Sequence, residues 1–143
     1  MEFITSNFDQ LNWWAIIVAT ISTMPVGYVW YDLKMGFGKR WAKMNGLSEK
    51  ELSSTDGMAK TFGLMLLTSL LTAVIMASFI IATDVSGFWE SLVFGLIFGV
   101  VLRGGAHIIH NGFTRKPMEL TFIDVGHDMV SLSVVAVILG LWQ

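Results

Sequence analysis

The chain contains no cysteine among its 143 residues, which excludes disulfides, thiolate catalysis and cysteine-ligated metals. Charged residues are scarce as well, at 14%, against roughly one quarter in a typical soluble domain. The formal net charge is −2, and no basic stretch is large enough to suggest a surface that binds nucleic acid. What remains is hydrophobic sequence, which makes up 54% of the chain.

Four long apolar runs account for that hydrophobic share. They cover residues 11–31, 59–83, 88–112 and 118–142 approximately. Each approaches or exceeds the ~20 residues that cross a ~30 Å hydrocarbon core. The first run follows no Lys or Arg and is longer than a signal-peptide core, so we expect a retained helix. We predict one all-α transmembrane domain over residues 1–143, an integral membrane four-helix bundle with short loops that is surrounded by the lipid bilayer.

The connection between the first two runs holds a segment that suits the membrane interface. Around residues 36–46, apolar side chains alternate with basic ones: Phe37, Trp41 and Met44 with Lys39, Arg40 and Lys43. This pattern predicts a short interfacial helix. We favour a topological anchor over a specific lipid site for its basic face. Ser48 and Glu51 predict a capping box just after it.

The basic residues predict the orientation. Eight of the nine flank the 1–2 and 3–4 connections: Lys34, Lys39, Arg40, Lys43, Lys50, Lys60, Arg115 and Lys116. The positive-inside rule then places both connections in the cytoplasm and both termini outside. We therefore expect a multi-pass protein of the bacterial inner (plasma) membrane. The ninth basic residue, Arg103, lies within an apolar run.

Ionisable and polar residues interrupt the third and fourth runs. The third carries Arg103, His107, His110 and Asn111, and the fourth carries Glu119, Asp124, His127, Asp128 and Ser131. At 1.5 Å per residue, Arg103 and Asp128 lie about 13 and 15 Å from the turn between the runs, near mid-membrane. A helical hairpin that turns near residues 114–116 predicts that Arg103 contacts Asp128 and that His107 faces Asp124.

Unpaired charges at that depth are costly. Left alone, Arg103, Asp124 and Asp128 would together cost on the order of 9 kcal/mol in a bilayer. We therefore predict a buried polar network between the third and fourth spans. Its members are Arg103, His107, Asp124, His127 and Asp128, with His110, Asn111, Glu119 and Ser131 around it.

Three interpretations of this network compete. It is a set of ion pairs that fixes helix register, or it exchanges protons in an ion-coupled transporter or channel-type oligomer, with Arg103 as a fixed counter-charge. The third is a membrane-embedded metal site, since His107 with His110 and Asp124 with His127 have the spacing of di-metal bundles. We rank the metal site last, because His110 lies about one turn from the interface and Arg103 would repel a cation. We expect no metal and no cofactor.

An enzymatic function has little support in the sequence. Ser131 and Ser133 have no oxyanion-hole signature beside them, and no glycine-rich phosphate loop is present. We expect no catalytic residues, and we rank a lipid-modifying enzyme built on the His/Asp cluster below the other interpretations.

Small residues recur every fourth position in three of the spans and predict close helix packing. These ridges are Ala15, Ala19, Thr23 and Gly27, then Ser69, Ala73 and Ala77, and then Ser91, Gly95 and Gly99. We reason that one four-helix bundle cannot use all three internally. The ridges therefore predict a homo-oligomer, or an accessory or structural subunit of a larger membrane complex.

Several short motifs resemble one bacterial family, the domain of unknown function 1761. They are residues 12–13 (NW), 27–31 (GYVWY), 37–39 (FGK) with Trp41, Met44, Gly46 and Leu47, 123–127 (IDVGH) and 138–142 (ILGLW). The resemblance covers nearly the whole chain. It implies a four-helix membrane protein without an established activity.

Overall fold

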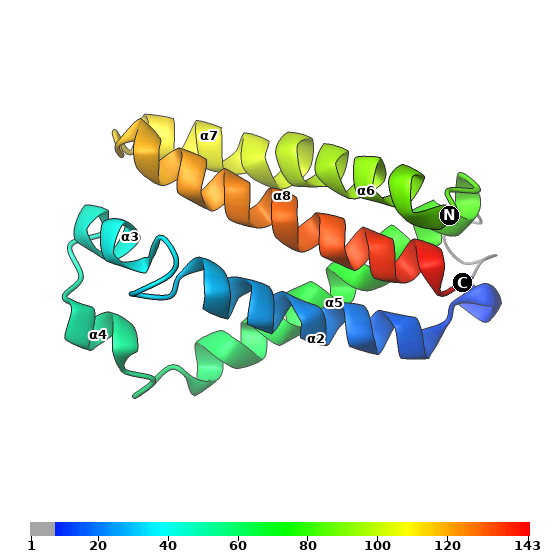
Figure 1. The fold of residues 1–143 in the computed structure, drawn as a ribbon, viewed down its shortest axis with the longest axis horizontal. Coiled ribbons are helices and arrows are strands. Elements are labelled where there is room, and N and C mark those ends of the chain that lie inside the picture. Colours follow the sequence, from blue (N-terminus) through cyan, green and yellow to red (C-terminus); the bar gives the residue numbers. More distant parts are fainter. Residues whose placement is uncertain (1–7) are drawn as a thin grey trace.

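A computed structural model describes residues 8–143 of the chain, and these residues form helices joined by turns and short loops, with no strand among them. Figure 1 shows the long helices running side by side. They are α2 (Trp13–Trp30), α5 (Ala59–Ala82), α8 (Met118–Leu141) and a third span made of α6 (Gly87–Ile97), the π-helical segment η2 (Phe98–Gly104) and α7 (Gly105–Phe113).

All four spans are long and apolar enough to cross a membrane. They lie over the four apolar runs of the sequence, and their outward faces carry large hydrophobic side chains such as Trp14, Leu67, Val101 and Phe122. Apolar side chains on the outside of a helical bundle suit lipid rather than water. The helices therefore indicate a membrane protein.

The shorter helices lie in the connections. η1 (Phe8–Gln10) precedes α2, and α3 (Gly38–Met44) and α4 (Glu49–Ser53) separate α2 from α5. The predicted capping box is confirmed, since Ser48 accepts from the Glu51 backbone N–H and Glu51 accepts from the Ser48 backbone N–H. The Ser48 hydroxyl and backbone N–H also lower the pKa of the exposed Glu51 carboxyl.

The last helix, α8, is the centre of the bundle. It packs against α2, α5, α6, η2 and α7. Buried residues occur along its whole length, from Leu120 in the first turn to Gly140 in the last. In Figure 1 it lies between α2 and the third span. A polar side chain on α8 therefore has few routes to lipid and must find its partners inside the protein.

The two ends of the bundle differ. We call the end that holds the start of α2 and the end of α8 the apolar end, and the opposite end, with α3, α4 and the α7–α8 turn, the polar end (Figure 1). The main hydrophobic cluster lies at the apolar end. Its buried members come from α2, α5 and α8 and from Leu11, two positions before α2: Leu11, Ala15, Ile16, Ala19, Ala73, Met76, Ala77, Ile80, Leu132, Val135, Ala136 and Leu139.

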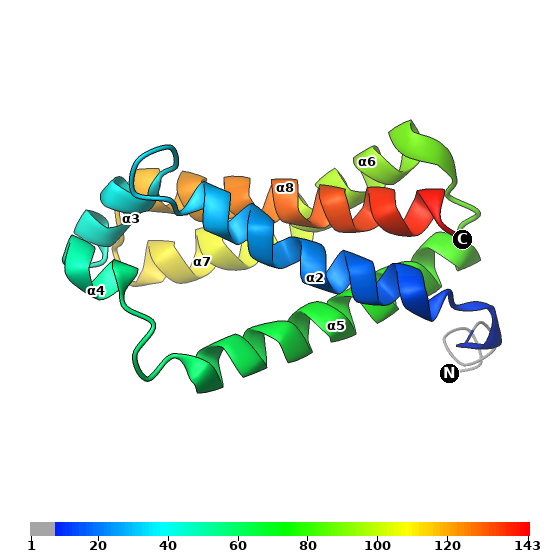
Figure 2. The same cartoon turned by 60° about the horizontal axis from the view of Figure 1, so that its bottom comes forward.

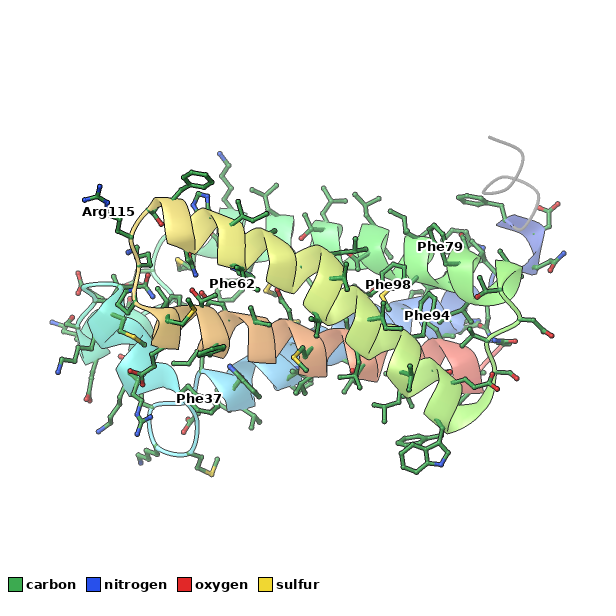
Figure 3. All side chains as sticks on the ribbon, turned by 90° about the horizontal axis from the view of Figure 1, so that it is seen from above. Phe37, Phe62, Phe79, Phe94, Phe98 and Arg115 are labelled. Atoms are coloured by element: carbon green, nitrogen blue, oxygen red, sulfur yellow. The ribbon has the colours of Figure 1, made fainter. Side chains whose placement is uncertain are left out.

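Aromatic rings complete this cluster on one side. Figure 3 shows Phe79, Phe94 and Phe98 close together near the apolar end. The Phe94 and Phe98 rings stack at 4.6 Å between centroids, and Phe79 meets Phe98 edge-on at 5.9 Å. Such ring pairs contribute about 0.5–1.5 kcal/mol beyond the area that they bury. They join α5 to the third span at this end.

Two glycines let the third span approach α8 closely. A methyl group added to Gly95 would lie 2.5 Å from the Ser133 Cα, and one added to Gly99 would lie 2.7 Å from the Met129 Cα. Neither distance is possible for a side chain, so both positions require glycine. This contact is the small-residue packing typical of membrane helices.

The three small-residue ridges are all used within this one bundle. Ala15 and Ala19, Ala73 and Ala77, and Ser91 with Gly95 are buried between helices of the same chain. The expectation that one bundle cannot use all three ridges is therefore wrong. The reason is that α8, at the centre, receives helices from several sides.

At the polar end the bundle opens. Every buried residue of α5 lies between Ala73 and Ile80, and the first turns of this helix, from Ala59 to Leu64, are exposed. Figure 2 shows α5 diverging from α2 toward this end. The side chains of the polar end therefore have a less crowded setting than those of the apolar end.

Candidate functional site

The site is built around Asp128, in the middle of α8. This residue lies ten positions after Met118 and thirteen before Leu141, so about 15 and 20 Å of helix separate it from the two ends. Its side chain is only 4% exposed. A carboxylate at this position is far from water on both sides and needs compensation by basic groups.

Three basic side chains supply that compensation. Arg103 Nε and His107 Nε2 lie 3.4 and 3.1 Å from Asp128 Oδ2, and His127 Nδ1 lies 3.3 Å from Asp128 Oδ1. The contact between Arg103 and Asp128 is the one that the hairpin register predicts. Neither nitrogen has hydrogen-bond geometry toward Oδ2. The Arg103 contact is therefore a charge contact, and the His107 contact becomes one when the imidazole is protonated.

The predicted partner of His107 is wrong. His107 contacts Asp128, one turn farther along α8 than the expected Asp124. Side chains on a helix lean toward its N-terminus, so on two antiparallel helices they lean in opposite directions. His107 leans toward the level of Arg103, and Asp128 leans toward the level of His107. The prediction paired residues whose Cα atoms lie at the same position along the hairpin, and it did not include the direction in which the side chains point.

The basic partners of Asp128 are unequally covered. The side chain of His127 is 20% exposed, that of His107 is 38% exposed and that of Arg103 is 47% exposed. Thus His127 lies inside the bundle, whereas His107 and Arg103 extend from Asp128 to the surface of the third span. In the expected network, the Asp128 carboxylate is therefore buried, whereas the Arg103 guanidinium is partly exposed.

Arg103 lies in the π-helical segment η2. A π-turn adds a residue to the turn and shifts the phase of everything that follows, and such segments often occur at functional sites. Within η2, Gly99 and Gly104 are buried, and a methyl group on Gly104 would lie 2.9 Å from the Val125 side chain. The π-helical segment therefore holds Arg103 beside α8, where its backbone is helical but departs from α-helical geometry.

Asp124 forms a second cluster one turn nearer the polar end. Its Oδ1 accepts hydrogen bonds from the indole N–H of Trp41 at 2.9 Å and from the Tyr31 hydroxyl at 3.4 Å. Its Oδ2 accepts from the Asn111 amide at 3.5 Å, and that amide also donates to Thr121 Oγ1 at 3.2 Å. Asp124 therefore joins α3, α2 and α7 to α8.

His127 and Tyr31 lie between the two clusters. Their ring centroids are 5.1 Å apart, and the Trp30 ring meets the edge of the same imidazole at 6.3 Å. Within residues 8–143, His127 Nε2 is buried without a hydrogen-bond partner. Side chains thus contact one another in series from Asp128 through His127 and Tyr31 to Asp124 and Trp41 of α3, and the contact between His127 and Tyr31 is one of rings rather than of polar atoms.

The aromatic members of this arrangement were not predicted as part of the site. In the sequence, Trp30 and Tyr31 stand only within the motif of residues 27–31, and Trp41 belongs to the segment that suits the membrane interface. Trp30 donates its indole N–H to the Ile123 carbonyl at 3.1 Å, so all three bring a polar hydrogen to α8. The available signal was that Tyr and Trp usually find a hydrogen-bond partner when they are buried.

The remaining predicted residues divide by position. Asn111 belongs to the Asp124 cluster, and Ser131 is buried on α8 one turn beyond Asp128. His110 is exposed on α7, and Glu119 pairs with Arg40 at 3.4 Å on the surface. Among residues 8–143 no group of three or more His, Asp and Glu side chains is arranged to hold a metal ion.

Chemically, the site can hold and pass a proton. A carboxylate with an imidazole on either side of it is a set of groups that can accept and release protons. The Arg103 guanidinium stays charged under all ordinary conditions, so it balances the charge of Asp128 without taking part in the exchange.

Comparison with known proteins gives one family. The family model that matches covers residues 14–140 and carries the description "Protein of unknown function (DUF1761)". No curated protein and no solved structure was found to match the chain.

Proposed function

Since the chain belongs to the DUF1761 family, whose description assigns no function, we propose a function from the site itself: the protein is a proton-exchanging membrane protein that couples proton movement to transport. Asp128 is the central group. The observation that carries this proposal is the buried Asp128 carboxylate with Arg103, His107 and His127 within 3.4 Å of it.

The charges of the cluster suit proton exchange. With Asp128 ionised, Arg103 charged and both imidazoles neutral, the four side chains carry no net charge. One added proton makes the cluster cationic, whether it resides on the carboxylate or on His107 or His127. Charge interactions are stronger in the low dielectric of a bundle interior than in water. Each gain or loss of a proton therefore changes the forces between α8 and the third span.

Access to the cluster is proposed from the polar end. Side chains contact one another in series from Asp128 through His127, Tyr31 and Asp124 to Trp41 of α3. The contact between His127 and Tyr31 is one of rings, and the others are polar. Toward the apolar end, the hydroxyls of Thr20, Ser78 and Ser91 donate to carbonyls of their own helices. Most of the other buried side chains there are apolar, and Ser131 and Ser133 of α8 are the polar ones nearest Asp128. A site open to one side at a time is what coupled transport requires, rather than a continuous pore.

The proposed orientation follows from charge. All the Lys and Arg residues outside the spans lie in the connections at the polar end. By the positive-inside rule this end faces the cytoplasm of a bacterial inner (plasma) membrane, with both termini outside. The cluster then takes its proton from the cytoplasmic side.

Proton flux into liposomes tests the proposal. With the purified protein in the membrane and an imposed potential, a pH-sensitive dye inside should report faster proton movement than in protein-free liposomes. Asp128→Asn should reduce the flux to the protein-free rate. Asp84→Asn is the matched control, because Asp84 lies in the exposed α5–α6 turn at a positive φ that Asn also tolerates. Flux that survives Asp128→Asn refutes the proposal.

A second candidate function is that of a subunit in a homo-oligomer or in a larger membrane complex. The half-exposed side chains of Arg103 and His107 favour it, since a charge exposed to hydrocarbon at mid-span costs about 2.5–3.5 kcal/mol. A second copy or another protein over this face would remove that cost. Mass measurement in nanodiscs tests this, and a strictly monomeric protein without a co-purifying partner contradicts it.

A further inference from the structure

A cavity at the polar end lies apart from the Asp128 cluster. It has a volume of about 270 Å³ and is lined by Trp30, Phe37, Arg40, Glu119, Phe122, Ile123 and Gly126. Small-molecule sites typically enclose about 300–1,000 Å³, so this space suits part of a ligand whose remainder lies outside. α2, the loop after it, α3 and α8 all contribute to its walls.

The walls change from charged to apolar along α8. Glu119, at the second position of the helix, pairs with Arg40 at 3.4 Å, and both side chains are well exposed. Phe122, Ile123 and Gly126 follow deeper in the span. Gly126 lies seven positions after Glu119, a rise of about 10 Å. The cavity is therefore charged where the interface lies and apolar toward the membrane centre.

The apolar wall is firmly held. Trp30 and Phe37 contact each other with ring centroids 4.9 Å apart, and the Phe37 N–H donates to the Trp30 carbonyl at 2.7 Å. The Trp30 indole N–H is bonded to the Ile123 carbonyl. A methyl group on Gly126 would lie 2.9 Å from the Trp30 ring. These contacts hold the two tilted aromatic rings beside α8.

We infer that this cavity binds a phospholipid whose headgroup carries a primary ammonium, as phosphatidylethanolamine does. Arg40 contacts the phosphate and Glu119 accepts from the ammonium, which replaces their mutual ion pair. One acyl chain lies along Trp30, Phe122 and Gly126. The polar-to-apolar direction of the cavity matches that of a lipid in the same leaflet. The inference depends on the helices spanning a membrane and is independent of proton exchange at Asp128.

The headgroup preference follows from charge complementarity. A cation and a carboxylate side by side suit a zwitterionic headgroup better than a purely anionic one, which Glu119 repels. A trimethylated ammonium has no N–H to donate, so phosphatidylcholine loses the hydrogen bond to Glu119. The basic face of α3 would then do more than anchor the protein, which is the role that the sequence alone favours.

Quenching of Trp30 fluorescence tests the inference. The full chain is placed in nanodiscs of phosphatidylcholine that contain brominated phosphatidylethanolamine, phosphatidylcholine or phosphatidylglycerol in trace amounts. The quenching that disappears in Trp30→Phe is the signal of the cavity. We expect at least fivefold tighter binding of the ethanolamine lipid than of the other two. Equal binding of all three lipids, or stronger binding of phosphatidylglycerol, overturns the inference.

Matched variants locate the recognition. Glu119→Gln should remove the preference for the ethanolamine lipid over the choline lipid, and Arg40→Gln should weaken binding of both. Lys43→Gln and Glu49→Gln change the same charges on or near α3 but do not line the cavity, so they should leave the preference unchanged. Loss of preference in these controls as well overturns the assignment to the cavity.

Soluble competitors distinguish a lipid from its headgroup. Glycerophosphoethanolamine and inorganic phosphate share the headgroup chemistry but have no acyl chain. We expect neither to displace the brominated lipid at millimolar concentration. Displacement by either compound would show an anion site and would contradict a lipid site.

Discussion

The apolar and polar ends of this bundle use the same central helix in two different ways. At the apolar end, α8 presents Leu132, Val135 and Ala136 to alanines and a methionine, and Gly95 lets the third span touch its backbone. At the polar end, α8 presents Asp124 and Asp128 to side chains from α2, α3, η2 and α7. Close packing of apolar side chains stabilises the apolar end, and ion pairs and hydrogen bonds stabilise the polar end.

The difference shows how a small membrane protein keeps charged groups in its interior. Packing at the apolar end holds α2, α5, α6 and α8 together mainly through apolar contacts, with hydrogen bonds such as Asn12 to Trp142 and Gln143 to Val85 near the helix ends. The polar end can then leave α5 apart from the bundle and Arg103 half-exposed. If this division holds, changes at the apolar end should reduce stability alone, and changes at the polar end should also alter protonation and local structure.

The largest effect should come from Gly95→Leu at the apolar end. The new side chain cannot fit against Ser133, so the third span must move off α8, and we expect a loss of about 3 kcal/mol, at the upper end of the usual cost of overpacking. The free energy of unfolding in bicelles measures it. Gly112→Leu is the matched control, because no atom lies within 4 Å of the added carbon there. Equal losses in the two variants would contradict tight packing at Gly95.

Asp128→Asn should have the next largest effect. It leaves Arg103 without its carboxylate, and we expect a loss of about 2–3 kcal/mol, below the 3–5 kcal/mol of a fully buried pair because Arg103 is half-exposed. Arg103→Leu should cost less, since His107 and His127 still face Asp128. The same unfolding measurement applies to each variant.

The double variant sharpens the comparison. Arg103→Leu with Asp128→Leu should recover part of the stability that Asp128→Asn loses, because both desolvation costs disappear together. Proton flux should still be lost. If the double variant is as unstable as Asp128→Asn, the contact between Arg103 and Asp128 contributes nothing to the free energy of unfolding.

Trp41→Phe should loosen the polar end locally. It removes the indole N–H that donates to Asp124, and a hydrogen bond to a charged group contributes about 1.5–3 kcal/mol. We expect faster amide hydrogen exchange over residues 38–44 and unchanged exchange over residues 132–140. Trp89→Phe, at an exposed tryptophan of α6, serves as control. Uniformly faster exchange at both ends would show that the ends are not independent.

The smallest effect concerns the turn after α2. Asp32 Oδ1 accepts the backbone N–H groups of Met35 and Lys34 at 2.7 and 2.8 Å, and these bonds lower the pKa of the exposed Asp32 carboxyl. The turn is therefore stabilised above the unfolded-state pKa of about 3.9 and loses this support as the pH falls through the lower folded pKa. Amide chemical shifts of Lys34 and Met35 should follow that titration.

Asp32→Asn is the test of this assignment. Asn accepts the same backbone N–H groups through its amide oxygen, so the turn should persist and the titration of the two amides should vanish. Amide shifts that keep titrating in the variant would identify another carboxyl as the cause.

Much of the fold could be predicted from the sequence. The length of apolar runs and the capping pattern at Ser48 are local properties, and helical phase with hairpin register was enough to pair Arg103 with Asp128. The partner of His107 depended on the lean of side chains, which a register of Cα heights omits. The π-helical segment around Arg103 had only glycines as a signal, and glycines are common in membrane helices.

The rest of the site required the tertiary arrangement. Trp41 meets Asp124 across 83 positions of sequence, and nothing in the intervening chain fixes how α3 folds back. The internal use of all three small-residue ridges likewise depends on the central position of α8, which no single helix encodes. Hydrophobic pattern determines which side of a helix is apolar, but the neighbours of that side follow from the whole bundle.

The most direct test of the proposed function is the infrared spectrum of the Asp128 carboxyl in liposomes with one orientation of the protein. The carboxyl band is assigned by its loss in Asp128→Asn, and the pH is changed on one side of the membrane at a time. The account predicts that the band responds to pH on the side of α3 and the α7–α8 turn and does not respond to pH on the other side. A band that ignores pH on both sides, or follows only the side of the apolar end, would contradict it.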